Sequence, residues 1–366
     1  MMTQNVRAAV RQALPVIAAA AADVDRTGAV DPSVISGLHD AGFFAMLQPK
    51  AFGGIEAAPA DYLAVTRELS AACTSTGWLA GWLGVNTWHL SLFDERAQRD
   101  VWGPDPRTLL CESYAPTGRL ERDGDNFRLS GRWSRCTGIL HSSWLMAAAV
   151  LVGEDGAAQD FLVALVPQAD YVVESSWNSV GLRGIGAHDV VVSGAVVPRY
   201  RTFGWVSDEQ LGRLAPLYRL PQPTMYTHTG TAPLLGAAQN ILSALGPRAT
   251  SSVDPVAMAR SDLELSVAQI DRNLGDLMES VSAGLAADPD LVLRSRRDQV
   301  LASERAVAAI RTFIAHAGGR AAGDLIVERV WRDVQTAQTH VASNVEQVLA
   351  LVGRHSFGME VDEILW

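Results

Sequence analysis

Apolar residues recur with a helical period at both ends of the chain and with a strand period in the middle. Residues 31–47 carry apolar side chains at helical spacing behind Asp31, a favourable N-cap, and a first-turn proline. Residues 59–85 begin in the same way and become wholly apolar, which predicts a buried helix. An alanine-rich stretch from Ala13 predicts a first helix rather than a signal peptide, because no cleavage site follows it.

Between residues 109 and 205 the apolar runs become short and alternate with polar residues. After the Asp-Gly turn at residues 123–124, Phe127, Leu129 and Trp133 alternate with polar neighbours, and further short runs are separated by Gly, Asp and Pro. This pattern predicts a small β domain. The proline-bearing stretch 206–232 that follows it is typical of a loop.

The last third of the chain holds three long amphipathic segments joined by short links, at residues 257–285, 296–317 and 325–352. Long helices with short connections favour an antiparallel bundle. The sequence therefore predicts an α+β protein with three parts. These are an N-terminal helical domain, a central β domain and a C-terminal antiparallel helical bundle, at residues 1–108, 109–205 and 206–366 respectively.

Composition and charge exclude several classes of function. The chain has 366 residues, 48% of them hydrophobic, and a net charge of −10 without any basic run. Nucleic acid and anionic membrane surfaces are therefore unlikely partners. Three widely spaced cysteines, without a CxxC pair, predict free thiols in a reducing cytoplasm and no metal site. No apolar run reaches the roughly 18 residues of a membrane span.

Seven segments together resemble a known family, although no single one is decisive. The chain is similar to the acyl-CoA dehydrogenase fold and, within it, to the oxygenase components of two-component (group D) flavin-dependent monooxygenases. The branch that hydroxylates 3-hydroxy-9,10-seco-steroids and 4-hydroxyphenylacetate is the most similar. The resemblance implies that the central domain is β-barrel-like and that the C-terminal bundle has four helices. The resemblance covers nearly the whole chain, and it is carried by residues 40–78, 85–103, 113–118, 130–138, 180–199, 327–340 and 353–358.

One position separates two branches of that fold. The dehydrogenases it resembles usually end the helix "VERxxRDxxxxQxYEG" in a glutamate that removes a proton from the substrate. Here Val341 stands at that position and cannot accept a proton. The preceding residue, His340, matches a functional histidine of the hydroxylases. Since an imidazole has a pKa of about 6.5 and a phenol one of about 10, the resemblance implies that His340 takes the phenolic proton.

The resemblance also implies the reaction and its partners. Reduced FMN or FAD, supplied by a separate NAD(P)H-dependent flavin reductase, would react with O2 to give a C4a-hydroperoxide. An aromatic substrate, phenolic or polycyclic, attacks the terminal oxygen best as a phenolate. A homotetramer in the cytoplasm is implied as well. Shielding the oxygenated flavin from water would require a closed, hydrogen-bonding site.

Further site residues follow from the resemblance alone. The catalytic set is His340, His89 and Thr137. The cofactor set is Trp133, Cys136, Thr137, Gly138, Tyr114, Gly318, Gly319 and Arg320, and the substrate set is Trp82, Trp88, His89 and Trp144. Two features depart from the family. Cys136 and Thr137 replace two small polar residues of the flavin turn, and the helix that carries phosphate-binding residues is shortened near 246–255, where Arg248 is the available cation.

Other interpretations of the same residues stay open. From periodicity alone, His340 lies beside the apolar stripe on a face that could be solvated, and His89 could be a hydrogen-bonded core histidine. The glycines could form ordinary turns and helix caps, and the tryptophans could be core. Two rival functions follow: an acyl-CoA dehydrogenase or oxidase with bound FAD, and a flavin-free protein with a binding or non-redox role. The substrate's identity and the choice between FMN and FAD are open.

Overall fold

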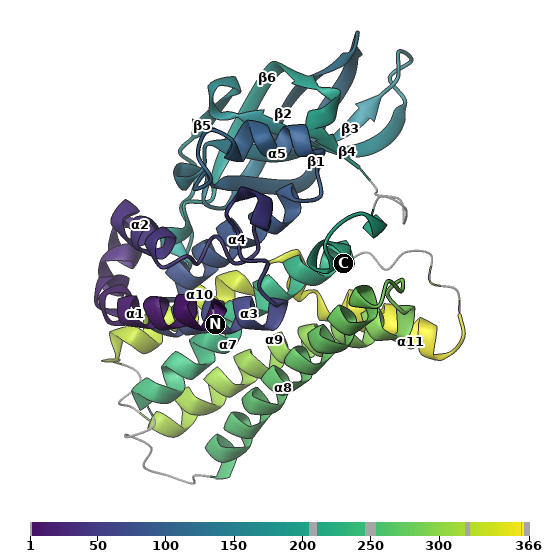
Figure 1. Ribbon diagram of the computed structural model, residues 1–366. Coiled ribbons are helices and arrows are strands. Elements are labelled where there is room, and N and C mark those ends of the chain that lie inside the picture. The colour runs from purple at the N-terminus through teal and green to yellow at the C-terminus, as the bar shows by residue number, and fades with distance from the viewer. Residues whose placement is uncertain (1, 205–210, 246–253, 319–322, 360, 362–366) are drawn as a thin grey trace.

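The computed structural model describes residues 2–204, 211–245, 254–318, 323–359 and 361, and its amino-terminal part is helical (Figure 1). Asp31 caps the second helix as predicted, accepting a hydrogen bond from the Ser33 backbone N–H at 2.8 Å. The apolar run from residue 59 is interrupted at Cys73, whose backbone is extended, so that it forms two helices. The helices are α1 (Met2–Thr27), α2 (Pro32–Asp40), α3 (Pro59–Ala72), α4 (Thr74–Leu90) and α5 (Glu95–Trp102).

The central part forms one seven-stranded sheet with the order β5-β6-β2-β1-β3-β4-β7. The pair β1 and β3 is parallel and the other pairs are antiparallel. The Asp-Gly turn joins β1 to β2 at the Asp123 and Asn126 pair, with Gly124 at φ +60°. The strands are β1 (Leu110–Asp123), β2 (Asn126–Cys136), β3 (Trp144–Val152), β4 (Ala158–Pro167), β5 (Tyr171–Glu174), β6 (His188–Pro198) and β7 (Thr202–Phe203).

The carboxyl-terminal part is helical again, and its long helices lie side by side below the sheet (Figure 1). Helix α7 packs against α3, α4 and α9, and α8 packs against α9. The helices are α7 (Gln222–Leu245), α8 (Asp254–Ser282), α9 (Pro289–Ala317), α10 (Leu325–Ala337) and α11 (Val345–Ser356). Together with the sheet, this arrangement confirms the predicted α+β fold of the acyl-CoA dehydrogenase type.

Besides the break at Cys73, two further predictions of secondary structure are wrong in detail. The loop expected over residues 206–232 is helical in its last part, because α7 begins at Gln222 and holds Pro223 in its first turn, where no backbone N–H is needed. The single helix expected over 325–352 is divided into α10 and α11.

Side chains near the break compete for backbone groups and so end α10. The Thr339 hydroxyl donates to the Thr336 carbonyl at 2.8 Å, and Asn344 caps α11 by accepting from the Gln347 N–H at 3.1 Å. His340 has an extended backbone (φ −72°, ψ 139°) and opens a short 3-10 helix, η9 (Val341–Ser343). His340 therefore projects from a turn and not from a helix face.

Two hydrophobic cores hold the molecule together. The larger one unites the helices with one face of the sheet, through residues such as Leu110, Met146 and Leu165. The smaller one lies within the β part and contains Leu129 and Trp133. Within the described residues, none of the helices is long and apolar enough to cross a bilayer.

Candidate functional site

Five aromatic rings from four elements form a connected chain between the helices and strand β1. His340 beside η9 contacts Trp82 of α4 with ring centroids 4.9 Å apart, and Trp82 stacks on Tyr226 of α7 at 6.0 Å. Tyr226 meets His89 of α4 at 5.5 Å, and His89 stacks on Tyr114 of β1 at 5.4 Å. We name these five residues the aromatic row. It joins both histidines of the predicted catalytic set.

His340 is held by a hydrogen bond within its own turn. Its Nδ1 accepts from the Ala342 backbone N–H at 3.2 Å, so the neutral ring carries its proton on Nε2. Burial, aided by the cations Arg135 and Arg296, lowers the pKa of His340 to about 4. The ring is therefore neutral near pH 7 and offers Nε2–H as a hydrogen-bond donor. A group with such a low pKa is a weak acceptor for a phenolic proton.

Helix α9 fixes the turn that carries His340. The carbonyl of Ala342 accepts hydrogen bonds from Arg296 Nη1 at 3.0 Å and from Gln299 Nε2 at 3.3 Å. Arg296 is only 6% exposed, and its Nε and Nη2 have no hydrogen-bond partner within the described ranges. Arg296 is not among the site residues predicted from the sequence. A cation on the apolar side of a long helix was the signal available.

His89 is completely buried in the last turn of α4, and a carboxylate lies next to it. Its Nδ1 is 2.6 Å from Glu112 Oε1, although the two atoms are not aligned as a straight hydrogen bond. Glu112 Oε2 accepts from the Tyr226 hydroxyl at 2.5 Å. The Tyr114 hydroxyl is 3.1 Å from His89 Nε2. Burial, followed by the charge of Glu112, raises the pKa of both tyrosines, so both phenols keep their protons.

The turn after β2 packs closely on α4. Gly138 has φ +79°, and a Cβ atom there would lie 2.8 Å from Leu83 Cδ2 and 2.9 Å from Leu79 Cδ1. Leu79 and Leu83 directly follow Trp78 and Trp82, which contact the His340 ring. The turn and His340 therefore lie on neighbouring faces of the same two turns of α4.

Thr137 and Arg135 give this turn its polar groups. Thr137 is half-buried, and its hydroxyl has no hydrogen-bond partner in the part of the chain that the structure describes. Arg135 is exposed and has φ +61°, a conformation that is unfavourable outside glycine and often found at functional sites. The hydroxyl of Thr137 is thus available to a ligand beside α4.

Two residues of the predicted cofactor set lie behind this turn. Trp133 is fully buried in the core of the β part and donates from Nε1 to the Ala148 carbonyl at 2.8 Å. Cys136 is buried in the same core. Their side chains therefore stabilise the sheet and are not walls of a ligand site, which corrects the prediction.

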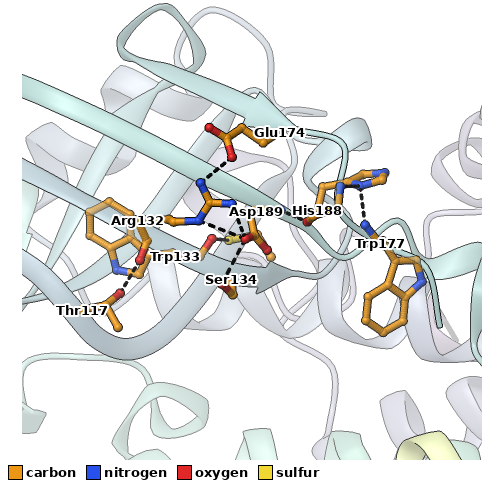
Figure 2. Close-up of polar contacts among 10 residues, drawn as sticks. Thr117, Arg132, Trp133, Ser134, Glu174, Trp177, His188 and Asp189 are labelled. Atoms are coloured by element: carbon orange, nitrogen blue, oxygen red, sulfur yellow. Dashed lines mark hydrogen bonds and ion pairs between the residues drawn. The ribbon is translucent and has the colours of Figure 1, made fainter.

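On the outer side of β2, polar contacts hold the strand in place (Figure 2). Arg132 pairs with Asp189 of β6 at 2.8 Å and also with Glu174 of β5. Ser134 donates to the same Asp189 carboxylate at 3.1 Å. This network ties β2, which leads into the Thr137 turn, to β6 and β5.

The remaining predicted residues lie around the aromatic row, away from it or outside the described residues. Trp88 is buried behind the aromatic row, 6.2 Å from the Tyr226 ring, and donates from Nε1 to Leu217. Trp144 on β3 is outside the row and packs under Arg201, so its predicted role as a substrate wall is not supported. Gly318 ends α9 with φ +64°. Gly319, Arg320 and Arg248 lie outside the described residues.

The donors around the row fit a flat heteroaromatic group with a polar edge, such as a flavin. Trp82 Nε1 is buried and has no partner among the described residues, and the Thr137 hydroxyl and His340 Nε2–H are further donors. Val341 is 53% exposed and offers no proton acceptor. The site therefore has hydrogen-bond donors where the dehydrogenases of the resembling fold have a carboxylate.

Comparison with known proteins gives a consistent result. Two sequence profiles match, "Acyl-CoA dehydrogenase, N-terminal domain" at residues 1–106 and "Acyl-CoA dehydrogenase, C-terminal domain" at residues 248–345. The chain is 34% identical to the flavin-dependent monooxygenase oxygenase subunit HsaA of Mycobacterium tuberculosis, covering 97% of this chain and 96% of the relative. It is 30% identical to the FADH(2)-dependent resorcinol hydroxylase oxygenase component of Rhizobium sp., covering 90% and 88%.

Solved structures give the same picture. The crystal structure of the HsaA monooxygenase from M. tuberculosis superposes with a TM-score of 0.94 at 32% identity, covering 99% of this chain and all of that one. XiaF from Streptomyces sp., in complex with FADH2 and glycerol, superposes with a TM-score of 0.90 at 26% identity, covering 100% and 97%. The likeness therefore extends over the whole length of these proteins.

Proposed function

The chain belongs to the acyl-CoA dehydrogenase family, and on this premise we propose that it is the oxygenase component of a two-component flavin-dependent monooxygenase. Its relatives include a monooxygenase oxygenase subunit and a resorcinol hydroxylase. When bound, reduced FMN or FAD supplies the electrons that activate O2 for insertion into an aromatic ring. The substrate class is an aromatic compound, phenolic or polycyclic.

The observation that carries this proposal is the replacement of a base by a donor at the turn after α10. Val341 cannot perform the proton abstraction of a dehydrogenase. His340, neutral and with its proton on Nε2, can hold an oxygen atom by a hydrogen bond near pH 7. The expectation that His340 is the base stays a prediction, and its hydrogen bonding favours the donor role. Thr137 supplies a second donor from the neighbouring face of α4.

The remaining residues of the site bind the aromatic ligand and exclude water. Trp82 and Tyr226 present flat faces on which an aromatic ring can stack. Trp78, 3% exposed, closes the side of the His340 ring. Arg135 stands next to Thr137 and is suited to an anionic edge or phosphate of the flavin. A closed site of this kind protects reactive intermediates from hydrolysis and decay.

Partners follow from the proposal. A separate flavin reductase must deliver reduced flavin, because an oxygenase component of this class does not reduce it. We take that reductase to be NAD(P)H-dependent and both proteins to be cytoplasmic. A homotetramer is part of the same proposal, and the exposed Leu325 (78%) and Phe357 (84%) give the α10 and α11 region an apolar surface suited to subunit contact.

Anaerobic mixing of the protein with reduced FMN or FAD, followed by an oxygen pulse, tests the proposal. We expect a transient absorbance band in the near ultraviolet before the spectrum of oxidised flavin appears. Direct formation of oxidised flavin without a transient would contradict a monooxygenase. Purification of a yellow protein that is bleached by acyl-CoA would instead indicate a dehydrogenase, and calorimetry showing no flavin binding would indicate a flavin-free role.

A further inference from the structure

A buried carboxylate at the far end of the aromatic row has no assigned role. The Glu112 side chain on β1 is only 5% exposed and His89 is 0% exposed. The carboxylate contacts His89 Nδ1 through Oε1, at 2.6 Å, and the Tyr226 hydroxyl through Oε2, at 2.5 Å. It is therefore held between α4 and α7 by two groups that can each carry a proton.

No cation offsets this carboxylate. Among the described residues, no lysine or arginine forms an ion pair with Glu112, and His89 is its single cationic candidate. The groups that face His89 from the surrounding elements are uncharged rings, namely Phe93, Tyr114, Phe203 and Tyr226. Within the described residues, His89 is therefore the one group placed to offset the charge of this buried carboxylate.

Stability alone does not account for the pair. Replacing a buried ion pair by apolar residues of similar size is often neutral or stabilising, because desolvation of the charges is costly. Here the pair is set among aromatic residues. It also lies two ring contacts from Trp82, which touches His340. The position of the pair indicates a chemical role at the proposed site.

We propose that Glu112 is a positioning residue that holds the proton of His89 on Nδ1, so that His89 Nε2 accepts the phenolic proton of the substrate through the Tyr114 hydroxyl. This inference rests on the proposed function. A hydroxyl is needed because the His89 ring has no exposed surface. That of Tyr114 lies 3.1 Å from Nε2 and 3.3 Å from Nδ1, and Nε2 is the nitrogen left for it because Nδ1 faces Glu112. Tyr226 keeps the carboxylate in place from its other oxygen.

The proton transfer balances without a further reactant. The O–H bond of the substrate breaks and its proton bonds to the Tyr114 oxygen, while the original Tyr114 proton bonds to His89 Nε2. The electron pair stays on the substrate oxygen as a phenolate, and the imidazolium charge is offset by Glu112. When the hydroxylated ring loses its ring proton to water, the imidazolium returns its own proton to the product oxygen by the same path.

The substitution Glu112→Gln keeps the shape and the hydrogen bond to Tyr226 but removes the charge. The control is Glu121→Gln on the same strand, where the carboxylate is 50% exposed and pairs with Arg119. Two readouts are used. The first is the pH at which 4-nitrophenol, bound to the flavin-free protein, turns into the coloured nitrophenolate. The second is the hydroxylation rate with phenols of increasing acidity, supplied with reduced flavin.

For E112Q we expect ionisation of bound nitrophenol to move to higher pH by about one unit, and hydroxylation of a weakly acidic phenol to fall about 10- to 100-fold near pH 7. The defect should shrink for acidic fluorinated phenols and at high pH, where the substrate ionises unaided. Tyr226→Phe should show the same trend more weakly, and E121Q should match the unmodified protein. Circular dichroism confirms that each variant is folded.

Two results would overturn the inference. One is a rate loss in E112Q that is equal for all phenols, because a merely structural role would produce it. The other is an unchanged ionisation of bound nitrophenol in both E112Q and Y226F. If instead the unmodified protein produces no near-ultraviolet transient with reduced flavin and O2, the proposed function itself has failed, and E112Q need not be made.

Discussion

The orientation of His340 depends on a hydrogen bond to its own turn. His340 therefore makes two contributions, one to the stability of the turn and one to ligand binding, and substitutions can separate them. As N-cap of η9 it accepts from the Ala342 N–H, and as a neutral ring it donates from Nε2. Asparagine can replace it in the first role, because it is a favourable cap, but its amide does not reach as far. Alanine removes both roles.

We expect H340N to remain as stable as the unmodified protein and H340A to lose about 0.5–2 kcal/mol, the usual value of a cap. Both should lower the fraction of oxygen that is inserted into the substrate, by about tenfold or more. Because the pKa of His340 is lowered to about 4, the ring stays neutral from about pH 5 upward. Coupling in the unmodified protein should therefore not change between pH 5.5 and 8, measured as product formed per reduced flavin. A rise in coupling across this range would instead indicate that His340 is a base.

Thr137 allows a second test at the scale of one atom. Valine has nearly the same shape as threonine but no hydroxyl, whereas serine keeps the hydroxyl. Since the Thr137 hydroxyl has no partner in the described part of the protein, T137V should leave the free energy of unfolding nearly unchanged. It should nevertheless release more hydrogen peroxide, by about tenfold or more, because one donor to the ligand is lost. T137S should resemble the unmodified protein, and equal peroxide release from both variants would contradict the role.

Single residues of the site could be predicted unevenly. His340, His89 and Thr137 carry recognisable sequence contexts, and the structure brings the histidines into one aromatic row. Glu112 and Tyr226 were missed. A glutamate in a β-type run gives no signal that its partner is a histidine 23 residues earlier in the sequence, and Tyr226 fell in a stretch interpreted as a loop. Trp133 and Trp144 were assigned to ligand sites because a sequence cannot show which face of a strand meets the helices.

At the scale of elements, glycine marks where two helices meet. A Cβ atom on Gly236 of α7 would lie 2.3 Å from the Arg67 carbonyl and 2.8 Å from Ser70 Cβ, both on α3. The variant G236A should therefore destabilise the protein by about 1–3 kcal/mol through overpacking. The matched control is Gly275 of α8, which is exposed and has open space around it. There alanine should add up to about 1 kcal/mol of stability. Urea unfolding shows whether each variant loses or gains free energy of unfolding, and a destabilised G275A would contradict the argument.

Helix α10 is tied to the β part by a buried carboxylate, which makes this contact sensitive to pH. Asp333 is 2% exposed and accepts from the Leu182 N–H at 2.6 Å. Burial raises the pKa of Asp333 from 3.8 to about 7, against the opposing effect of that hydrogen bond. The folded protein then binds a proton more readily than the unfolded chain between pH 4 and 7. Stability from this group is therefore complete below about pH 4 and is lost as the pH rises to 7.

The loss has a slope of at most about 1.4 kcal/mol per pH unit. We expect D333N, which is neutral at every pH and can still accept from Leu182, to remove this part of the pH dependence. It should be more stable than the unmodified protein at pH 8. E328Q, on an exposed face of the same helix, serves as the control. Unfolding free energies in urea at pH 5 and pH 8 give the comparison, and parallel profiles for D333N and the unmodified protein would refute the assignment.

The elements themselves could be predicted from the sequence where a regular apolar period extends over a long segment and turn residues mark its ends. The Asp31 cap and the Asp-Gly turn are examples. Boundaries failed where side chains compete with the backbone. Thr339, His340 and Asn344 end α10 through hydrogen bonds that a hydrophobic pattern does not contain. Pro221 and Pro223 suggested a loop, although proline in a first turn is compatible with the start of α7.

At the scale of the whole molecule, the larger core is shared by the helices and one face of the sheet. Leu110, Met146 and Leu165 contribute to it from the strands, alongside residues of α3, α4 and α7. A core shared in this way couples the two parts, because exposure of either part also exposes apolar surface of the other. We therefore expect the helical and β parts to unfold in one cooperative step rather than as separate domains.

The three cysteines report on this step from both parts. Cys73 lies at the junction of α3 and α4, and Cys111 and Cys136 lie in the β core, all three at most 3% exposed. Burial raises the pKa of the Cys73 and Cys111 thiols, so that thiolate is scarce in the folded state. A thiol reagent at neutral pH should label none of the three until the protein opens. In increasing urea, the opening free energies of Cys73 and Cys136, resolved by mass spectrometry of the labelled peptides, should fall together and with the same slope. Earlier labelling of Cys136 would show that the sheet opens independently, and the shared core would then not couple the two parts.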